Sequence, residues 1–149
     1  MVTTGVRGIR YRLCTELDEL LPPLVATLGL AYVEPERIRL VASHGTRTRA
    51  YARIYGLPKP VQVGHGIPPS YTIELICENL EKADCRDVTR VIVHELLHIP
   101  TTFSGALRPH GQYVNHRVVN KLAERVPDLL AETLCKRIKR CCQQPAYSR

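Results

Sequence analysis

Hydrophobic residues recur at helical spacing over residues 13–28, near the start of the chain. Thr15 and the acidic residues that follow it suit the N-terminal turn of a helix, where the helix dipole favours negative charge. Pro22 and Pro23 interrupt this run, and proline cannot donate the backbone hydrogen bond of a helix interior. We therefore expect a first helix that is kinked or shortened by the two prolines.

Apolar and polar residues then alternate, as in strands with one buried face. Residues 38–42 and 51–55 alternate on either side of a His-Gly-Thr turn, which predicts an antiparallel hairpin. Residues 61–63 are a candidate for a short strand, and residues 71–77 alternate over a full strand length. The pattern predicts a small, mostly antiparallel sheet.

Helical patterns occupy the second half of the chain. Asp87, Thr89 and Arg90 suit the start of a helix that continues through the apolar run around residues 91–97. A loop rich in Pro, Gly and Ser covers 100–111, and further helices are expected over 113–125 and 127–142. The order of elements predicts an α+β fold, and a chain of 149 residues suits one domain, 1–149.

The composition of the chain limits the classes of protein to which it can belong. No run approaches the roughly 18 uninterrupted apolar residues of a membrane span, and the start of the chain lacks the apolar core of a signal peptide. We therefore expect a cytoplasmic protein without a membrane segment. The single Met and the 11 Pro indicate a thermophilic origin. The net charge of +7 predicts weak, nonspecific attraction to nucleic acids, although no nucleic-acid-binding motif accompanies it.

The six cysteines include no C-x-x-C pair of the zinc-finger type. Cys135 and Cys142 lie about two turns apart on one expected helix, too far to bridge each other, so a disulfide there needs a distant partner. Cys77 and Cys85 could close a short loop. Buried free thiols are the alternative, because disulfides inside cells occur chiefly in hyperthermophiles.

The segment His-Glu-Leu-Leu-His over 94–98 is an HExxH motif. On a helix, residues four apart share one face, so His94 and His98 can reach the same metal ion. Glu95 would then lie close enough to act on a metal-bound water. This arrangement favours one zinc ion and a metallopeptidase in which Glu95 is the general base.

A catalytic zinc ion usually takes three protein ligands and keeps one position open, so a third ligand is needed. We favour His110, because Pro109 and Gly111 on either side suit an unusual backbone path that folds back over the metal. The competitors for this position are His116, Glu124 and Asp128.

The developing oxyanion would need a further electrophile, and three residues are candidates by sequence proximity alone. These candidates are Arg108, Tyr113 and His116. A peptide or protein substrate would lie extended along an exposed strand beside the motif helix, hydrogen-bonding through its backbone. The residues expected to form that strand are Tyr71, Ile73 and Leu75.

Three segments, over 51–56, 69–74 and 94–111, resemble the putative phage metallopeptidase family. The last, which runs from His94 through Pro100 and Arg108 to Gly111, is the most specific. The resemblance implies a compact zincin-like fold, similar to Spartan-like and minimal gluzincin peptidases. It also implies His94 and His98 as zinc ligands, Glu95 as catalytic acid and base, and His110 as third ligand.

Two other functions compete with an intracellular zinc endopeptidase. A Spartan-like protease acting on DNA-bound proteins would account for the basic charge. A noncatalytic binding or regulatory domain stabilised by metal would account for the histidines without hydrolysis. Zinc content and peptide cleavage, measured for the wild type and for Glu95→Gln, discriminate between catalysis and binding.

Overall fold

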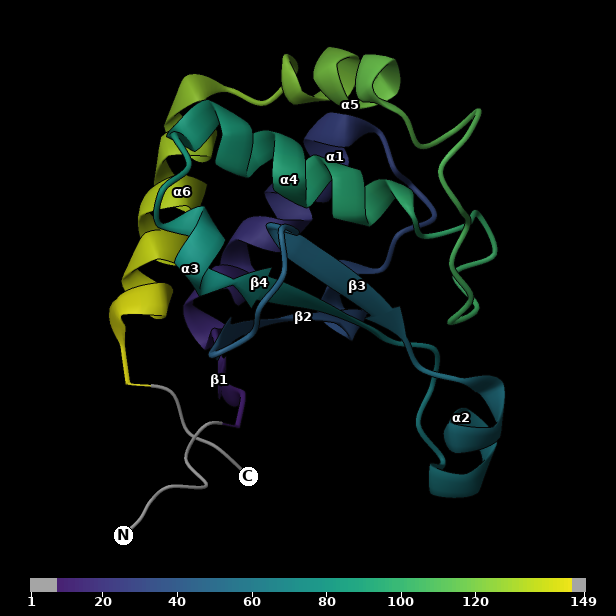
Figure 1. Ribbon diagram of the computed structural model, residues 1–149. Coiled ribbons are helices and arrows are strands. Elements are labelled where there is room, and N and C mark those ends of the chain that lie inside the picture. Colours follow the sequence, from purple (N-terminus) through teal and green to yellow (C-terminus); the bar gives the residue numbers. More distant parts are fainter. Residues whose placement is uncertain (1–7, 146–149) are drawn as a thin grey trace, which may run out of the picture.

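The computed structural model describes residues 8–145, which form an α+β fold (Figure 1). The strands of its single mixed sheet are β1 (Arg10–Leu13), β2 (Ile38–His44), β3 (Ala52–Gly56) and β4 (Tyr71–Ile76). The 3-10 helices are η2 (Thr15–Leu20) and η3 (Pro35–Arg37). The α-helices are α1 (Leu21–Leu28), α2 (Lys59–His65), α3 (Cys77–Leu80), α4 (Cys85–Leu97), α5 (His116–Ala123) and α6 (Asp128–Gln143).

The helix predicted over 13–28 is divided into three parts. Its first residue, Leu13, belongs to β1, which the hydrophobic pattern did not predict. The 3-10 helix η2 follows, and α1 begins only at Leu21. Pro22 and Pro23 lie in the first turn of α1, where backbone N–H groups have no partner within the helix. The two prolines therefore start the α-helix instead of kinking it.

The strands occur in the order β1-β2-β4-β3. β2 pairs with β4 in parallel, with Ile38 opposite Tyr71, while β3 pairs with β4 antiparallel, with Ala52 opposite Leu75. The hairpin predicted between residues 38–42 and 51–55 is wrong, because β4 lies between its two strands. Alternation predicts which face of a strand is buried, but it does not identify the neighbouring strand.

The strand expected to bind substrate is also placed wrongly. β4 is hydrogen-bonded on both sides, so it has no free edge for an extended peptide. The side chains of Tyr71, Ile73 and Leu75 are buried in the core. β3 instead forms the edge of the sheet next to α4 (Figure 1).

Residues 61–63 belong to a helix, not to the predicted short strand. Pro58 is the N-cap residue of α2 and Pro60 lies in its first turn, positions that the fixed φ of proline favours. Gly66 ends the helix in the left-handed conformation, at φ 63°. α2 projects from the end of the sheet, away from the other helices (Figure 1).

The helices predicted in the second half are present with shifted ends. α4 begins earlier than expected because the Asp84 carboxylate caps it, accepting a hydrogen bond from the Asp87 N–H at 2.9 Å. Asn115 caps α5 in the same way through the Val118 N–H, so this helix starts three residues after Tyr113. α6 follows Pro127, as predicted.

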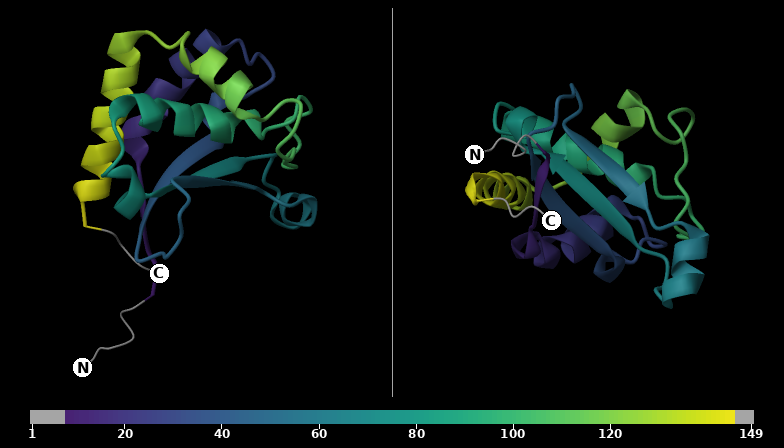
Figure 2. Two further views of the ribbon diagram at one scale, coloured as in Figure 1. Left: turned by 45° about the horizontal axis from the view of Figure 1, so that its top comes forward. Right: turned by 60° about the horizontal axis from the view of Figure 1, so that its bottom comes forward.

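α4 occupies the centre of the helical layer (Figure 2). It packs against β3, α5 and α6. Ile73 and Leu75 of β4, Ile92 and Leu96 of α4, and Ile138 of α6 are completely buried and belong to one hydrophobic cluster. This core fixes α4 across the sheet. None of the helices in the described part of the chain is both long and apolar enough to cross a membrane.

All six cysteines form disulfides, and each disulfide joins α6 to a distant segment. The pairs are Cys14–Cys141, Cys77–Cys142 and Cys85–Cys135. The loop predicted between Cys77 and Cys85 is wrong, as is the alternative of free thiols. The expectation that Cys135 and Cys142 need distant partners is confirmed.

Candidate metal centre

α4 carries the first two histidines on a face beside the core. Val88, Ile92 and Leu96, spaced four residues apart, are completely buried against the rest of the protein. His94 and His98 follow the same spacing on the neighbouring face, and both are half-buried. His98 is the C-cap residue of α4, so the chain leaves the helix directly after it.

The loop that follows α4 returns His110 to these two residues. Nε2 of His94 lies 2.9 Å from Nε2 of His110 and 3.3 Å from Nε2 of His98. The three imidazoles offer ligand atoms that all lie within 4.8 Å of one another. Tetrahedral zinc with Zn–N bonds near 2.05 Å would separate its nitrogens by about 3.3 Å. The imidazole set therefore fits one metal ion of this size.

A second contact sets the tautomer of His98. Its Nδ1 donates a hydrogen bond to the backbone carbonyl of Arg108 at 2.6 Å. Because a neutral imidazole carries one N–H, Nε2 then keeps its lone pair for a metal ion. The Arg108 N–H donates to the His98 carbonyl at 2.8 Å, so the loop and the helix end hold each other.

His94 is kept neutral by its surroundings. Burial is the main cause that lowers its pKa to about 4, and the nearby His98, His110 and His116 lower it further. Near neutral pH its ring is therefore unprotonated in the metal-free protein. A neutral imidazole is the form that binds metal, so protons compete little for this ligand.

Glu95 follows His94 on α4 and is almost completely buried, at 6% exposure. Its Oε2 is 3.8 Å from Nδ1 of His94. Burial raises the pKa of the Glu95 carboxyl to about 7. A carboxyl with a pKa near neutrality can both accept and return a proton, which is the property of a general acid–base group.

Two of the three imidazoles, those of His94 and His110, border a cavity of about 870 Å³ between α4 and α5. His94, His110 and His116 line it together with Val91, Val114 and Val119. Its polar lining comes from Asp87, Arg90, Asn115 and Asn120, and Tyr51 and Gly111 complete it. The site thus combines nitrogen donors with an apolar wall, a combination typical of pockets that bind small molecules or side chains.

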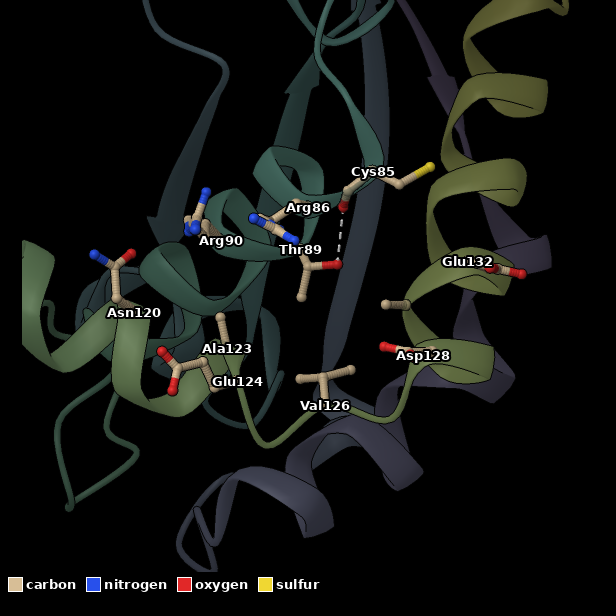
Figure 3. A pocket seen from close by; sticks show the side chains of 11 residues that line it. Cys85, Arg86, Thr89, Arg90, Asn120, Ala123, Glu124, Val126, Asp128 and Glu132 are labelled. Carbon is tan, nitrogen blue, oxygen red and sulfur yellow. Dashed lines mark hydrogen bonds between the residues drawn. The ribbon is translucent and has the colours of Figure 1, made fainter.

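The competing third ligands, His116, Glu124 and Asp128, are not part of the three-imidazole group. His116 begins α5 and lines the cavity without joining the three imidazoles. Glu124 and Asp128 line a second cavity of about 510 Å³, where they face Arg86 and Arg90 of α4 (Figure 3). The two cavities share Arg90 and Asn120 in their walls.

The predicted electrophiles Arg108 and Tyr113 contact each other. The guanidinium of Arg108 lies 4.8 Å from the centre of the Tyr113 ring. It also donates to the carbonyl of Leu97 at 2.8 Å and to the hydroxyl of Tyr32 at 3.1 Å. These contacts hold the Arg108 side chain at the C-terminal end of α4. Tyr32 lies 76 residues from Arg108 in the sequence, so no local pattern could have predicted this contact.

An α+β fold with three converging imidazoles defines the chain as a candidate metal-binding protein. The family model described as putative phage metallopeptidase matches residues 9–137, and the chain belongs to this family. Neither a curated protein nor a solved structure matches the chain.

Proposed function

We propose that the protein is a zinc-dependent metallopeptidase with a zincin-like active site. The observation that carries this proposal is the convergence of the Nε2 atoms of three imidazoles, with the buried carboxylate of Glu95 3.8 Å from Nδ1 of His94. His94, His98 and His110 would hold the ion. Three nitrogen donors suit zinc, which takes histidine in catalytic sites and leaves a coordination position open.

When bound, zinc would supply a Lewis acid that polarises the scissile carbonyl and lowers the pKa of water. Glu95 would accept the proton of the attacking water and later deliver it to the leaving amine. His98 is kept in the required tautomer by the Arg108 carbonyl. The buried position of Glu95 also limits access of solvent to this proton.

The substrate would be a peptide or protein segment in extended conformation. Among the described residues 8–145, β3 pairs with a strand on one side only, and it packs next to α4. Its free backbone groups can hydrogen-bond to a further strand, which is a common way to bind peptides. A side chain adjacent to the cleaved bond would enter the cavity whose apolar wall includes Val91, Val114 and Val119.

Zinc content and cleavage of a peptide library test this proposal. We expect one zinc per chain and cleavage that stops with a chelator. Glu95→Gln should keep zinc but lose about 10²–10⁴-fold in kcat. His110→Ala should weaken zinc binding, whereas the exposed His65→Ala on α2 is the matched control.

Two results would contradict the proposal. If zinc affinity is the same in His110→Ala and the wild type, His110 is not the third ligand. If the zinc-loaded wild type cleaves no peptide or protein, the noncatalytic metal-stabilised domain is the better description.

A further inference from the structure

We propose that Tyr71 is a positioning residue for the metal centre, which it serves by holding the loop that carries His110. This inference rests on the proposed metal site. Tyr71 lies on the central strand β4, and only 1% of its surface is exposed. Its hydroxyl donates to the Ala106 carbonyl at 2.7 Å and accepts from the Gly105 N–H at 2.8 Å. The hydroxyl therefore serves two backbone groups of the loop.

Neighbouring contacts hold the same part of the loop. The ring of Phe103 packs edge-on against Tyr71, with ring centres 5.0 Å apart. Phe103 has φ 45°, a conformation that a bulky residue adopts only when its surroundings enforce it. Gln62, which is also buried, donates through Nε2 to the carbonyls of Leu57 and Ser104 at 2.8 and 2.9 Å.

Glycine makes this close approach possible. Gly105 has φ +97°, which side chains rarely tolerate. A Cβ atom added to Gly56 of β3 would overlap the carbonyl of Gly105. The loop backbone therefore lies directly against the end of the sheet, within reach of the Tyr71 hydroxyl.

The anchored segment leads directly to the third imidazole. Arg108, two residues after Ala106, is fixed to His98 through both of its backbone groups. Pro109 then restricts the chain before His110. Beyond it, Asn115 donates to the carbonyl of Gly111 at 2.8 Å. His110 itself is exposed, so its place depends on these backbone anchors and not on burial of its own ring.

Metal affinity should therefore depend on the Tyr71 hydroxyl. An apparent dissociation constant rises in proportion as the competent conformation becomes less populated. Tyr71→Phe leaves the Gly105 N–H and the Ala106 carbonyl without their partner, which favours conformations with His110 displaced. We expect Zn²⁺ and Co²⁺ to bind about tenfold more weakly, the lower end of the effect of residues that orient metal ligands.

The experiment compares Tyr71→Phe with Tyr55→Phe in the full chain. Tyr55 is on the adjacent strand and its hydroxyl donates a hydrogen bond to Glu74 at 2.7 Å, so this control removes a tyrosine hydroxyl and its hydrogen bond without touching the loop. Each protein is titrated with Zn²⁺ against a competing chelator and with Co²⁺ by visible absorption. Tyr71→Phe should bind both ions more weakly and give an altered Co²⁺ spectrum, while Tyr55→Phe matches the wild type.

A second variant, Gln62→Met, releases the loop at Ser104 without changing Tyr71, and should weaken Co²⁺ binding in the same direction. Unchanged affinity and spectrum in Tyr71→Phe would overturn the inference, even if its thermal stability falls. If Tyr71→Phe does not fold, an unchanged Co²⁺ affinity in Gln62→Met would overturn the inference instead. Failure of the metal centre itself gives a different result, because His94→Ala and His110→Ala would then bind Co²⁺ like the wild type.

Discussion

The residue with the most unusual environment is Glu95. It carries an ionisable carboxyl that is almost completely buried and lies 3.8 Å from Nδ1 of His94, and burial raises its pKa to about 7. His94, the preceding residue of the helix, has a pKa lowered to about 4, again chiefly by burial. Two adjacent residues thus shift in opposite directions because burial disfavours the charged form of each.

These shifts predict a pH dependence for the stability of the metal-free protein. The pKa of Glu95 is higher in the folded state than in the unfolded state. Its contribution to the free energy of unfolding is therefore complete below about pH 4.5 and is lost as pH rises through about 7. Glu95→Gln removes this loss. Between pH 4.5 and pH 8, we expect the free energy of unfolding of the variant to rise by roughly 3 kcal/mol relative to that of the wild type, taking 1.36 kcal/mol per pKa unit.

The measurement is denaturant unfolding in the presence of a chelator, at several pH values. Comparing the two proteins isolates Glu95, because His94 acts in both and in the opposite sense, its contribution being lost as pH falls from about 6.5 to about 4. A stability difference that does not change with pH would show that Glu95 is not buried as described.

At the scale of elements, α6 is distinguished by its covalent links. Its three cysteines are bonded to Cys14, which lies between β1 and η2, to the first residue of α3 and to the first residue of α4. The last link ties α6 to the helix that carries His94 and Glu95. This disulfide thus supports the position of the metal-binding helix at the end opposite to His98.

Removing a disulfide should lower the free energy of unfolding by about 2–4 kcal/mol. The Cys14–Cys141 link spans 127 residues and Cys85–Cys135 spans 50. A longer loop gives the unfolded chain more freedom when it is opened, so Cys14→Ser/Cys141→Ser should be less stable than Cys85→Ser/Cys135→Ser by about 0.8 kcal/mol. Chemical denaturation of both double variants without reductant checks the order.

The disulfides have an independent control. Alkylation of the denatured, unreduced wild type should label none of the six cysteines, and peptide mapping should recover the three pairs. Labelling of Cys85 and Cys135 in the wild type would contradict the link between α4 and α6.

The whole molecule carries a net charge of +7. A charge of this size attracts polyanions through the release of counterions, without reading their sequence. We expect binding to duplex DNA in the range of about 10⁻⁴–10⁻⁶ M near physiological salt, weakening steeply as salt is raised. Fluorescence anisotropy with two unrelated duplexes measures this. Absence of binding at low salt would remove the support for a protease acting on DNA-bound proteins.

Much of the local structure could be predicted from the sequence. Helices over the second half follow from apolar spacing and from caps such as Asn115, which act within a few residues. The convergence of His94 and His98 follows from helical geometry alone. His110 could be proposed because Pro109 and Gly111 indicated a loop able to fold back, and the structure places its ring beside the other two.

Contacts between distant segments could not be predicted in this way. The central place of β4 depends on which strand offers the better buried neighbours, and alternation is the same for a central and an edge strand. The disulfide partners depend on where α6 packs. The bonds from Tyr71 to the loop join residues more than 30 positions apart.

The sequence by itself therefore determined the helix that bears His94, Glu95 and His98, because hydrogen bonds and side-chain spacing in a helix are local. The tertiary structure alone decided the free edge at β3, the three disulfide pairs and the anchoring of the His110 loop. Each of these depends on packing among segments that are far apart in the chain, and such packing is selected by the core as a whole.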